Sequence, residues 1–406
     1  MPPFLTFLRE NARWLAAGAL MSFLSSFGQT FFISIFAAEI RSEFGLGHAE
    51  WGAIYATGTA ASAVLMLWAG GLADRFRVAT LGAAVLAGIA IAAAFMALNS
   101  AAALLPAVIF CLRFTGQGMA SHVAMVAMAR WFVATRGRAL AVATLGFLLG
   151  EATMPLTFVW LKTRIDWQVL WALSALFVLA MIPVLWRLLK TERVPQSQGG
   201  TTAQTGMAGR HWRRAEALRH PLFWALMPAL VGSPACVTAF WFQQVHFAAV
   251  KGWDHLALVA VFPLGSAAFL VATAGFGWAI DRFGAGRVLP VYLVPLVLGF
   301  AVLGLTETLA GAAVGVMLLG LAGGGQATLP AACWAEFYGT RHLGAIKAAV
   351  ASAMVAGSAI GPAMSGALID AGAAMPVQLV AYAAWFLGAG LVMLAPLARA
   401  WAARPV

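Results

Sequence analysis

The segment GWAIDRFGAGRV at residues 277–288 repeats the pattern of an earlier segment, GGLADRFRVAT at residues 70–80. The residues that correspond at an offset of 207 are Gly70 and Gly277, Asp74 and Asp281, and Arg75 and Arg282. A second pair of segments, ARWFVATRGRA and AEFYGTRHLGA, follows at an offset of 206. Similarity at matching places predicts that one structural unit occurs twice, in parallel, along the chain.

The composition indicates what kind of unit is repeated. Of the 406 residues, 62% are hydrophobic and only 10% are charged, with a mean hydropathy of +0.88. Apolar runs of about 20 residues, each long enough to cross a membrane as a helix, recur along almost the whole chain. The sequence therefore predicts an all-α membrane protein. The twelve predicted spans are 14–36, 51–70, 79–98, 101–127, 138–161, 167–187, 221–247, 256–279, 287–306, 309–333, 345–368 and 376–398.

The distribution of basic residues predicts the orientation of these spans. Of the 25 Lys and Arg, 20 lie on the side of the N-terminus, and only Arg41, Lys162, Arg164 and Lys251 lie on the other side. Positive residues mark the cytoplasmic side, so we expect both termini in the cytoplasm and the protein in the inner cell membrane. The net charge of +11 comes from loops between spans, which argues against a nucleic-acid partner.

A polar segment at residues 190–220 separates the two sets of six spans. It is rich in Gly, Gln, Thr and Ser and then basic around Trp212. We expect residues 1–189 and 221–406 to form the two helix bundles, and residues 190–220 to form a cytoplasmic linker with an interfacial helix. A tether held at anionic headgroups is one interpretation of this linker, and a regulatory or partner-binding segment is the other.

The repeated aspartates lie where a carboxylate needs a partner. Asp74 and Asp281 fall at the C-terminal ends of predicted helices, where the macrodipole favours cations. A neighbouring helix N-terminus or an adjacent arginine would provide a partner. Such a contact between helices of different halves would be a breakable latch, and hence a gate.

The pattern G-x-x-x-D-R-F-G-x-x-R at residues 277–287 resembles the cytoplasmic loop signature of the major facilitator superfamily, with an echo at 70–77. RFTGQG at 113–118 and the Gly-Pro segment GSAIGPAMSG at 357–366 are similar to further marks of that family. The resemblance implies two pseudo-symmetric six-helix bundles and transport by alternating access. The residues that it assigns to gating are Gly70, Asp74, Arg75, Gly277, Asp281, Arg282 and Arg287.

A narrower resemblance concerns the substrate. The segment WFVATRGRALAVATLGFLLG at 131–150 is similar to the loop and fifth helix of bacterial relatives of monocarboxylate and oxalate–formate carriers. This resemblance implies a small organic anion, such as a monocarboxylate, as the transported solute.

Arg113 and Glu151 are the two charged residues deep within predicted spans. Intramembrane ionisable residues are costly and are functional candidates by default. At 1.5 Å per residue, their distances from the basic loops correspond to depths of about 25 and 20 Å, which a long arginine side chain could bridge. Leu319 and Pro362 occupy the corresponding places in the second half. A static ion pair, a proton-coupling carboxylate and direct substrate contact by Arg113 all fit this pattern.

Uncharged polar residues form a weaker signal. Side chains of this kind line a transport cavity or bond between helices, and the sequence allows both interpretations. The candidate cavity residues are Ser25 and Gln29 in the first span, Gln117 in the fourth, Gln243, Gln244 and His246 in the seventh, and Gln326 in the tenth.

The sequence therefore predicts a secondary transporter that moves a small solute, with proton coupling, as a monomer in the lipid bilayer. A drug or neutral-solute exporter is the alternative within transport, and a non-transporting membrane sensor is the alternative outside it. The three cysteines lie singly in apolar runs, and no nucleophile or metal-ligand spacing is present. We expect no enzyme activity, cofactor or metal.

Overall fold

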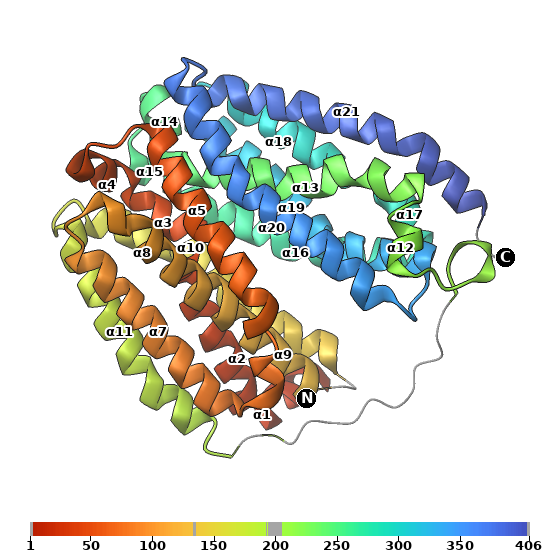
Figure 1. Ribbon diagram of the computed structural model, residues 1–406, viewed down its shortest axis with the longest axis horizontal. Coiled ribbons are helices and arrows are strands. Elements are labelled where there is room, and N and C mark those ends of the chain that lie inside the picture. The colour runs from red at the N-terminus through yellow and green to blue at the C-terminus, as the bar shows by residue number, and fades with distance from the viewer. Residues whose placement is uncertain (1–2, 133–134, 192, 194–204, 404–406) are drawn as a thin grey trace. The chain divides into compact units, whose positions relative to one another are not determined.

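The computed structural model describes residues 3–132, 135–191, 193 and 205–403, and every regular element in these ranges is a helix (Figure 1). Eleven helical segments are long and apolar enough to cross a membrane, and a bent pair, Ala12–Gly28 with Thr30–Phe44, makes a twelfth. The predicted all-α fold with its repeated spans is confirmed. The chain divides into two compact units, Met1–Gly199 and Gly200–Val406.

The first unit contains a short N-terminal helix, α1 (Pro3–Glu10), followed by six spans. The elements of these spans are α2 (Ala12–Leu24), η1 (Ser25–Gly28), α3 (Thr30–Ile33), η2 (Ser34–Phe36), α4 (Ala37–Phe44), α5 (His48–Ala69), α6 (Leu72–Arg75), α7 (Val78–Leu98), η3 (Ala102–Leu104), α8 (Leu105–Leu112), the π-helix η4 (Arg113–Ala120), α9 (Ser121–Trp131), α10 (Arg136–Leu161) and α11 (Trp167–Leu188).

The second unit begins with two single turns and also has six spans. Its elements are η5 (Met207–Gly209), α12 (Arg214–Ala217), α13 (Pro221–Phe242), α14 (Gln244–Val250), α15 (His255–Val259), α16 (Phe262–Phe283), α17 (Ala285–Val288), α18 (Leu293–Leu305), α19 (Leu309–Tyr338), α20 (Leu343–Asp370) and α21 (Met375–Ala402).

The two units pack their helices in the same way. In the first unit α2 packs on α10, α5 on α8, and α7 on α11. In the second unit α13 packs on α20, α16 on α19, and α18 on α21. Each unit thus pairs its first span with its fifth, its second with its fourth and its third with its sixth. The internal repeat seen in the sequence is therefore also a repeat of helix packing.

Glycines allow the first and fifth spans of each unit to approach closely. A Cβ added to Gly146 of α10 would lie less than 3.0 Å from the Ala19 carbonyl oxygen of α2. A Cβ added to Gly361 of α20 would be as close to the Ala235 carbonyl oxygen of α13. Small residues permit such backbone approach in membranes, where apolar burial between helices contributes little. The corresponding glycine motifs thus have the same packing role in both units.

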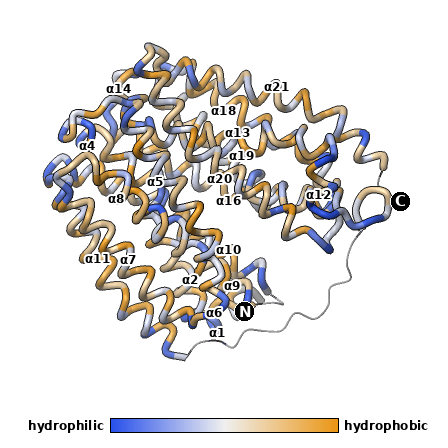
Figure 2. Tube along the Cα trace, in the orientation of Figure 1, coloured by the Kyte–Doolittle hydropathy of each residue, from blue (hydrophilic) through white to orange (hydrophobic). Residues whose placement is uncertain are grey.

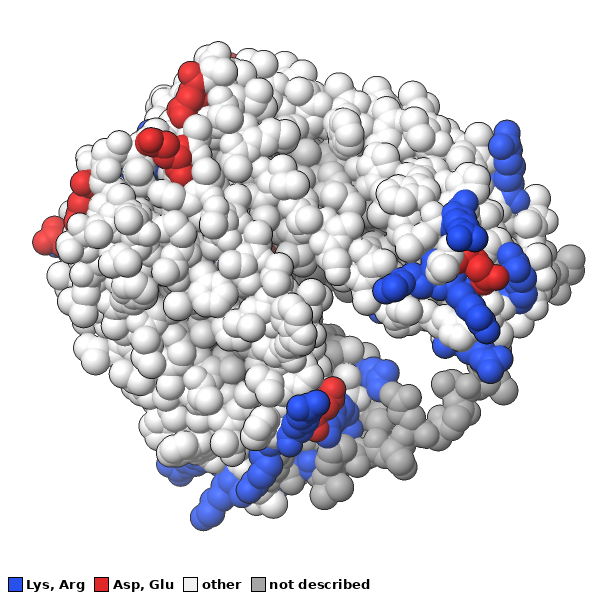
Figure 3. Space-filling model, in the orientation of Figure 1, with Lys and Arg blue, Asp and Glu red and all other residues white. Residues whose placement is uncertain are grey.

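The outer faces of the helices are apolar, as a lipid environment requires. Large side chains such as Leu67, Trp68 and Trp224 are exposed in the structure, and apolar residues cover the helix walls (Figure 2). Lys and Arg gather at helix ends, while the broad faces between the ends are almost without charge (Figure 3). The chain is therefore a multi-pass membrane protein.

The prediction for the linker falls partly on residues that the structure does not describe. Residues 192 and 194–204 lie outside the described part of the chain. In the described remainder the regular elements are the single turns η5 and α12, and the interfacial helix stays a prediction. Ala208, at a φ of 55°, interrupts helical geometry inside η5.

Candidate functional site

The first span is broken in the middle. The backbone of Gln29 is extended, with φ −86° and ψ 153°, and the two parts of the span on either side of it meet at 48°. Beyond the break, Phe32 packs against Phe158 and Trp171, with ring centroids 4.8 and 5.2 Å apart. These aromatic contacts fix the second part of the span in place. The break leaves carbonyl groups at the end of η1 without helical partners.

The fourth span is irregular at the same place. Its segment η4 is a π-helix. Such helices are rare, and those that occur are often found at functional sites. Gly28 of η1 and Gly116 of η4 touch through their backbones, because a Cβ on either glycine would come within 3.0 Å of the other's Cα. The two distorted spans therefore cross without side chains between them.

Arg113 lies at this crossing and is buried, with only 1% of its surface exposed. Its Nη1 donates hydrogen bonds to the Gly28 carbonyl oxygen at 3.1 Å and to Thr30 Oγ1 at 3.4 Å. Thr30 Oγ1 is 2.5 Å from the hydroxyl of Tyr55, and the guanidinium lies 5.3 Å from the Tyr55 ring centroid. The carbonyl at the C-terminal end of a helix carries partial negative charge, so it stabilises this buried cation. A helix break thus holds the membrane-buried arginine.

One N–H group of the Arg113 side chain is not used in these contacts. Arg113 Nε is buried and has no hydrogen-bond partner among the described residues. A buried N–H without a partner costs about 1–3 kcal/mol. The Nε edge of Arg113 therefore retains unused capacity to donate.

Glu151 is half-buried on α10. It follows Gly150, where an added Cβ would collide with Ser26 of η1, so it lies beside the broken span. Glu151 is not among the partners that the structure describes for Arg113, since the Gly28 carbonyl and Thr30 serve that role. The Arg113–Glu151 pair stays a prediction.

The other polar candidates of the first unit lie at the same crossing. Ser25 is buried and donates to the Ser22 carbonyl oxygen at 2.6 Å, while Gln29 forms the break and is half-buried. Gln117 is half-buried in η4, next to the Gly28–Gly116 contact. The first unit thus brings Arg113, Ser25, Gln29 and Gln117 together.

The second unit has a related interruption. Its first span ends at Phe242 and resumes with α14 at Gln244, and the joint is Gln243. Gln243 and Gln244 are buried, and Gln244 Nε2 donates to the Trp241 carbonyl oxygen at 3.1 Å. His246 is half-buried two residues further on. A glutamine therefore marks the break in the first span of both units.

Gln326 of α19 is a separate polar position. Both polar atoms of its amide are buried without a hydrogen-bond partner among the residues that the structure describes. A buried amide in this state costs free energy unless something else satisfies it. The amide of Gln326 therefore retains unused capacity to donate and accept hydrogen bonds.

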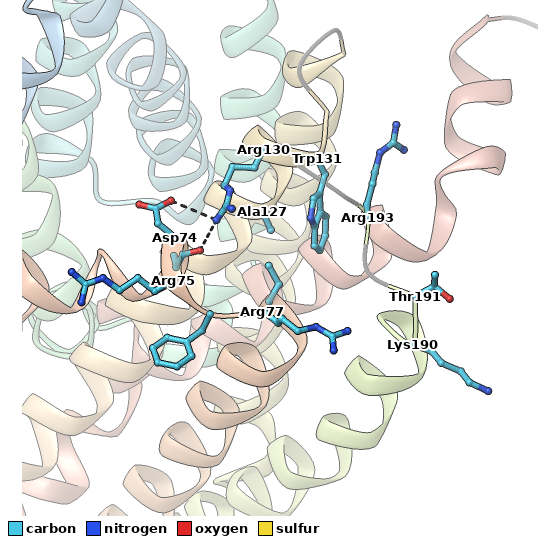
Figure 4. A pocket seen from close by; sticks show the side chains of 12 residues that line it. Asp74, Arg75, Arg77, Ala127, Arg130, Trp131, Lys190, Thr191 and Arg193 are labelled. Atoms are coloured by element: carbon cyan, nitrogen blue, oxygen red, sulfur yellow. Dashed lines mark hydrogen bonds and ion pairs between the residues drawn. The ribbon is translucent and has the colours of Figure 1, made fainter. Parts of the chain in front are cut away.

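The repeated loops have different partners in the two units. In the first unit, Arg130 Nη1 lies 3.5 Å from an Asp74 carboxylate oxygen and donates to the Ala73 carbonyl oxygen at 2.8 Å (Figure 4). Asp74 is largely exposed, and Arg130 comes from α9 of the same unit. Gly70 follows the last residue of α5 and caps this helix, and its carbonyl oxygen accepts a hydrogen bond from His122 Nε2 at 3.0 Å. The latch between the two halves stays a prediction.

In the second unit the residue that corresponds to Arg130 is Glu336. Its carboxylate accepts from the Gly286 N–H at 3.1 Å, in the first turn of α17. Asp281 is exposed and has no hydrogen bond or ion pair to the described residues. Arg287 lies over the Trp401 ring at 4.5 Å. The predicted gating residues of the second unit thus lie in the last turns of α16 and in α17. Glu336, and not Asp281, has a hydrogen-bond partner there.

The other two predicted gating residues of the second unit, Gly277 and Arg282 of α16, make fewer contacts. A Cβ on Gly277 would meet nothing within 4 Å, so close packing does not require a glycine at this position. Arg282 is exposed and lies 5.9 Å from the Trp278 ring centroid. Arg75, its counterpart in the first unit, is exposed as well.

The end of the linker is attached to the second unit by aromatic contacts. The backbone N–H of Trp212 donates to the Tyr338 carbonyl oxygen at 3.0 Å. The Trp212 ring packs edge-on against His220, with ring centroids 5.0 Å apart. Burial lowers the pKa of His220, and the positive charge of Arg210 lowers it further. Neutral His220 Nδ1 can then accept the Leu222 N–H at 3.3 Å and cap the first turn of α13.

No group of three His, Cys, Asp or Glu side chains that could hold a metal ion is found in the part of the chain that the structure describes. The three cysteines are free thiols.

Comparison with known proteins was made once this geometry was established. The family model of the Major Facilitator Superfamily matches residues 18–312, a range that contains the break in the first span, the π-helical fourth span and the repeated segments 70–80 and 277–288. The chain belongs to the major facilitator superfamily. It is therefore a membrane transporter of a small solute. A search with the sequence finds no match among curated proteins.

Solved structures show the same superfamily fold. A bacterial homologue of the human lysosomal transporter Spinster, inward-facing and unoccupied, is 17% identical with a TM-score of 0.70, and the match covers 100% of this chain and 99% of the other. The nucleoside transporter NupG is 14% identical with a TM-score of 0.71, over 95% and 98% of the two chains. At these identities the likeness concerns the fold alone.

Gly28 offers a test of the crossing in this superfamily member. Gly28→Ala places a Cβ within 3.0 Å of the Leu112 carbonyl oxygen and the Gly116 Cα, so it forces the first and fourth spans apart. We expect the free energy of unfolding to fall by about 3 kcal/mol, seen as a lower melting temperature in detergent. Gly275→Ala is the matched control, because its Cβ would meet nothing within 4 Å. Equal melting temperatures for the two variants would contradict the crossing.

Proposed function

We propose that this protein is a proton-coupled secondary transporter that moves a small organic anion, such as a monocarboxylate, by alternating access. The observation that carries the proposal is Arg113, a cation buried at the junction of two distorted spans with an unused Nε–H. Discontinuous helices of this kind form substrate sites in secondary transporters.

The chemistry of Arg113 suits a carboxylate. A guanidinium binds a carboxylate through two parallel N–H···O bonds, which add geometric specificity to charge attraction. Nη1 is engaged by Gly28 and Thr30, so the Nε edge is the part that would face the anion. An unpaired charge at the membrane centre costs about 3 kcal/mol, and an anionic solute would reduce this cost.

Glu151 is our candidate for the proton-carrying group. It is half-buried beside the break on the same unit. A monocarboxylate that crosses with one proton carries no net charge across the membrane, so the low dielectric opposes its passage less. We propose that Glu151 binds this proton in one part of the cycle and releases it in another.

A second candidate function, transport of an uncharged solute, is supported by a different residue, Gln326. The amide of Gln326 is buried without a described partner, and an amide recognises neutral hydroxyl or carbonyl groups. The structural likeness to a nucleoside transporter makes an uncharged solute the natural alternative. Drug export is the other neutral-solute form of this alternative.

The proposed orientation follows from the basic loops. Lys and Arg at the ends of the helices would place the repeated loops and both termini in the cytoplasm, in an inner membrane. The compact pairing of spans within each unit suits transport by a monomer.

Uptake into proteoliposomes tests the proposal. Purified protein would be reconstituted, and a pH gradient, acidic outside, would be imposed in the presence of labelled lactate, formate, oxalate or uridine. We expect accumulation of a carboxylate that a protonophore abolishes, and no accumulation of uridine. Uptake of uridine without carboxylate uptake would favour the neutral-solute function, and uptake that ignores the protonophore would contradict proton coupling.

A further inference from the structure

A cavity of about 560 Å³ lies at the end of the first unit that bears the repeated loop. It is formed by the loop after α5, the start of α7, the end of α9 and the chain after α11 (Figure 4). It does not include the Arg113 crossing, so the proposed solute site does not use it.

Cations dominate the wall of this cavity. The charged lining residues are Arg75, Arg77, Arg130, Lys190 and Arg193, against the carboxylate of Asp74. Asp74 pairs with Arg130, so the wall carries five cations against one carboxylate. The cavity is thus strongly positive, and it would attract an anion.

Two kinds of cation share this wall. Arg193 is held in place, because it donates to Asn11 Oδ1 and lies 4.5 Å from the Phe132 ring centroid. Arg75 and Lys190 are exposed and make no hydrogen bond or ion pair to the described residues. Fixed and free cations together can surround a multivalent anion.

The remaining wall is apolar. Phe76, Val78 and Trp131 line the cavity beside the charged groups, and Phe76 is 54% exposed. A phosphate attached to an apolar body matches this combination of cations and apolar surface.

We propose that this cavity is a phosphate-binding site. The phosphate would belong either to the headgroup of an anionic phospholipid at the membrane surface or to a soluble phosphate compound. The site brings together the repeated loop and the chain after the sixth span, so the bound phosphate joins the loop to the start of the linker.

The test compares two double variants in detergent. Arg75→Gln with Lys190→Gln removes two cations that have no described partner, so the fold is expected to survive. Arg282→Gln with Arg399→Gln removes two exposed arginines from the second unit and is the matched control. Melting temperature would be measured against short-chain phosphatidylglycerol, short-chain phosphatidylcholine and inorganic phosphate.

We expect phosphatidylglycerol or inorganic phosphate to stabilise the unaltered protein more than phosphatidylcholine does. The Arg75→Gln, Lys190→Gln variant should lose about thirtyfold in apparent affinity, and the control should lose none. Stabilisation by phosphatidylglycerol alone identifies a lipid, and stabilisation by inorganic phosphate identifies a soluble ligand. Equal losses in both double variants, or no preference over phosphatidylcholine, would overturn the proposal.

Discussion

Arg113→Gln is expected to lower the affinity for the transported anion about a hundredfold, the equivalent of about 3 kcal/mol for a charge-assisted hydrogen bond. The substitution keeps a side chain that can donate to the Gly28 carbonyl oxygen but removes the positive charge. The effect should appear as a raised KM in proteoliposomes and as lost thermal stabilisation by the anion.

Arg113→Lys provides the charge-retaining comparison. It keeps the cation but loses the fork geometry of the guanidinium, so we expect anion transport to be partly recovered. A neutral solute that binds at Gln326 should be unaffected by Arg113→Gln. Equal losses for anionic and neutral solutes, or the same behaviour for the Gln and Lys variants, would assign Arg113 a structural role only.

Glu151→Gln is expected to abolish accumulation driven by a pH gradient while exchange of solute across the membrane continues. Glutamine has nearly the shape of glutamate but cannot bind and release a proton, so coupling is lost and the binding site remains. Exchange by the variant should also become independent of pH over the range in which the unaltered protein responds.

A second carboxylate serves as the control for this experiment. Glu307 lies between two spans of the second unit, pairs with Lys251 at 2.7 Å and has a side chain that is 77% exposed. Glu307→Gln removes one negative charge without touching the membrane core, so uphill accumulation should persist. Uphill accumulation that also persists in Glu151→Gln would exclude Glu151 as the coupling group.

The sequence predicted the fold because the membrane imposes one length on every span. Most predicted limits agree with the helices to within a few residues, as for 79–98 and α7. The repeat of DRF loops and of glycine motifs also predicted which spans correspond, and the shared packing pairs confirm it. The linker was harder, because few apolar residues constrain it.

The site was predicted only in part. Arg113 was evident from its charge, but its partners Gly28, Thr30 and Tyr55 were not, because a carbonyl freed by a helix break leaves no mark in composition. One signal was present and not used. A Gly-Gln dipeptide occurs at 28–29 and at 116–117, where the spans are distorted, although a third one, at 325–326, lies in the continuous helix α19.

The loops show a further limit of reasoning from repeats. Asp74 and Asp281 correspond in sequence, yet the partner position holds Arg130 in one unit and Glu336 in the other. A cation there pairs with the loop aspartate, whereas a carboxylate there binds a backbone N–H of the following helix. Residues that correspond therefore keep their place in the fold while their bonding changes.

The contact of Gly28 with Gly116 bears on how such a protein can acquire a new cargo. The two spans meet through main-chain atoms, so the crossing angle does not depend on the side chains of the neighbouring residues Gln29 and Gln117. These positions can be replaced during evolution or by design without altering the scaffold that supports them. If Gln29 and Gln117 contact the solute, as the sequence predicts, then selectivity and architecture are encoded in different residues that are adjacent along the chain.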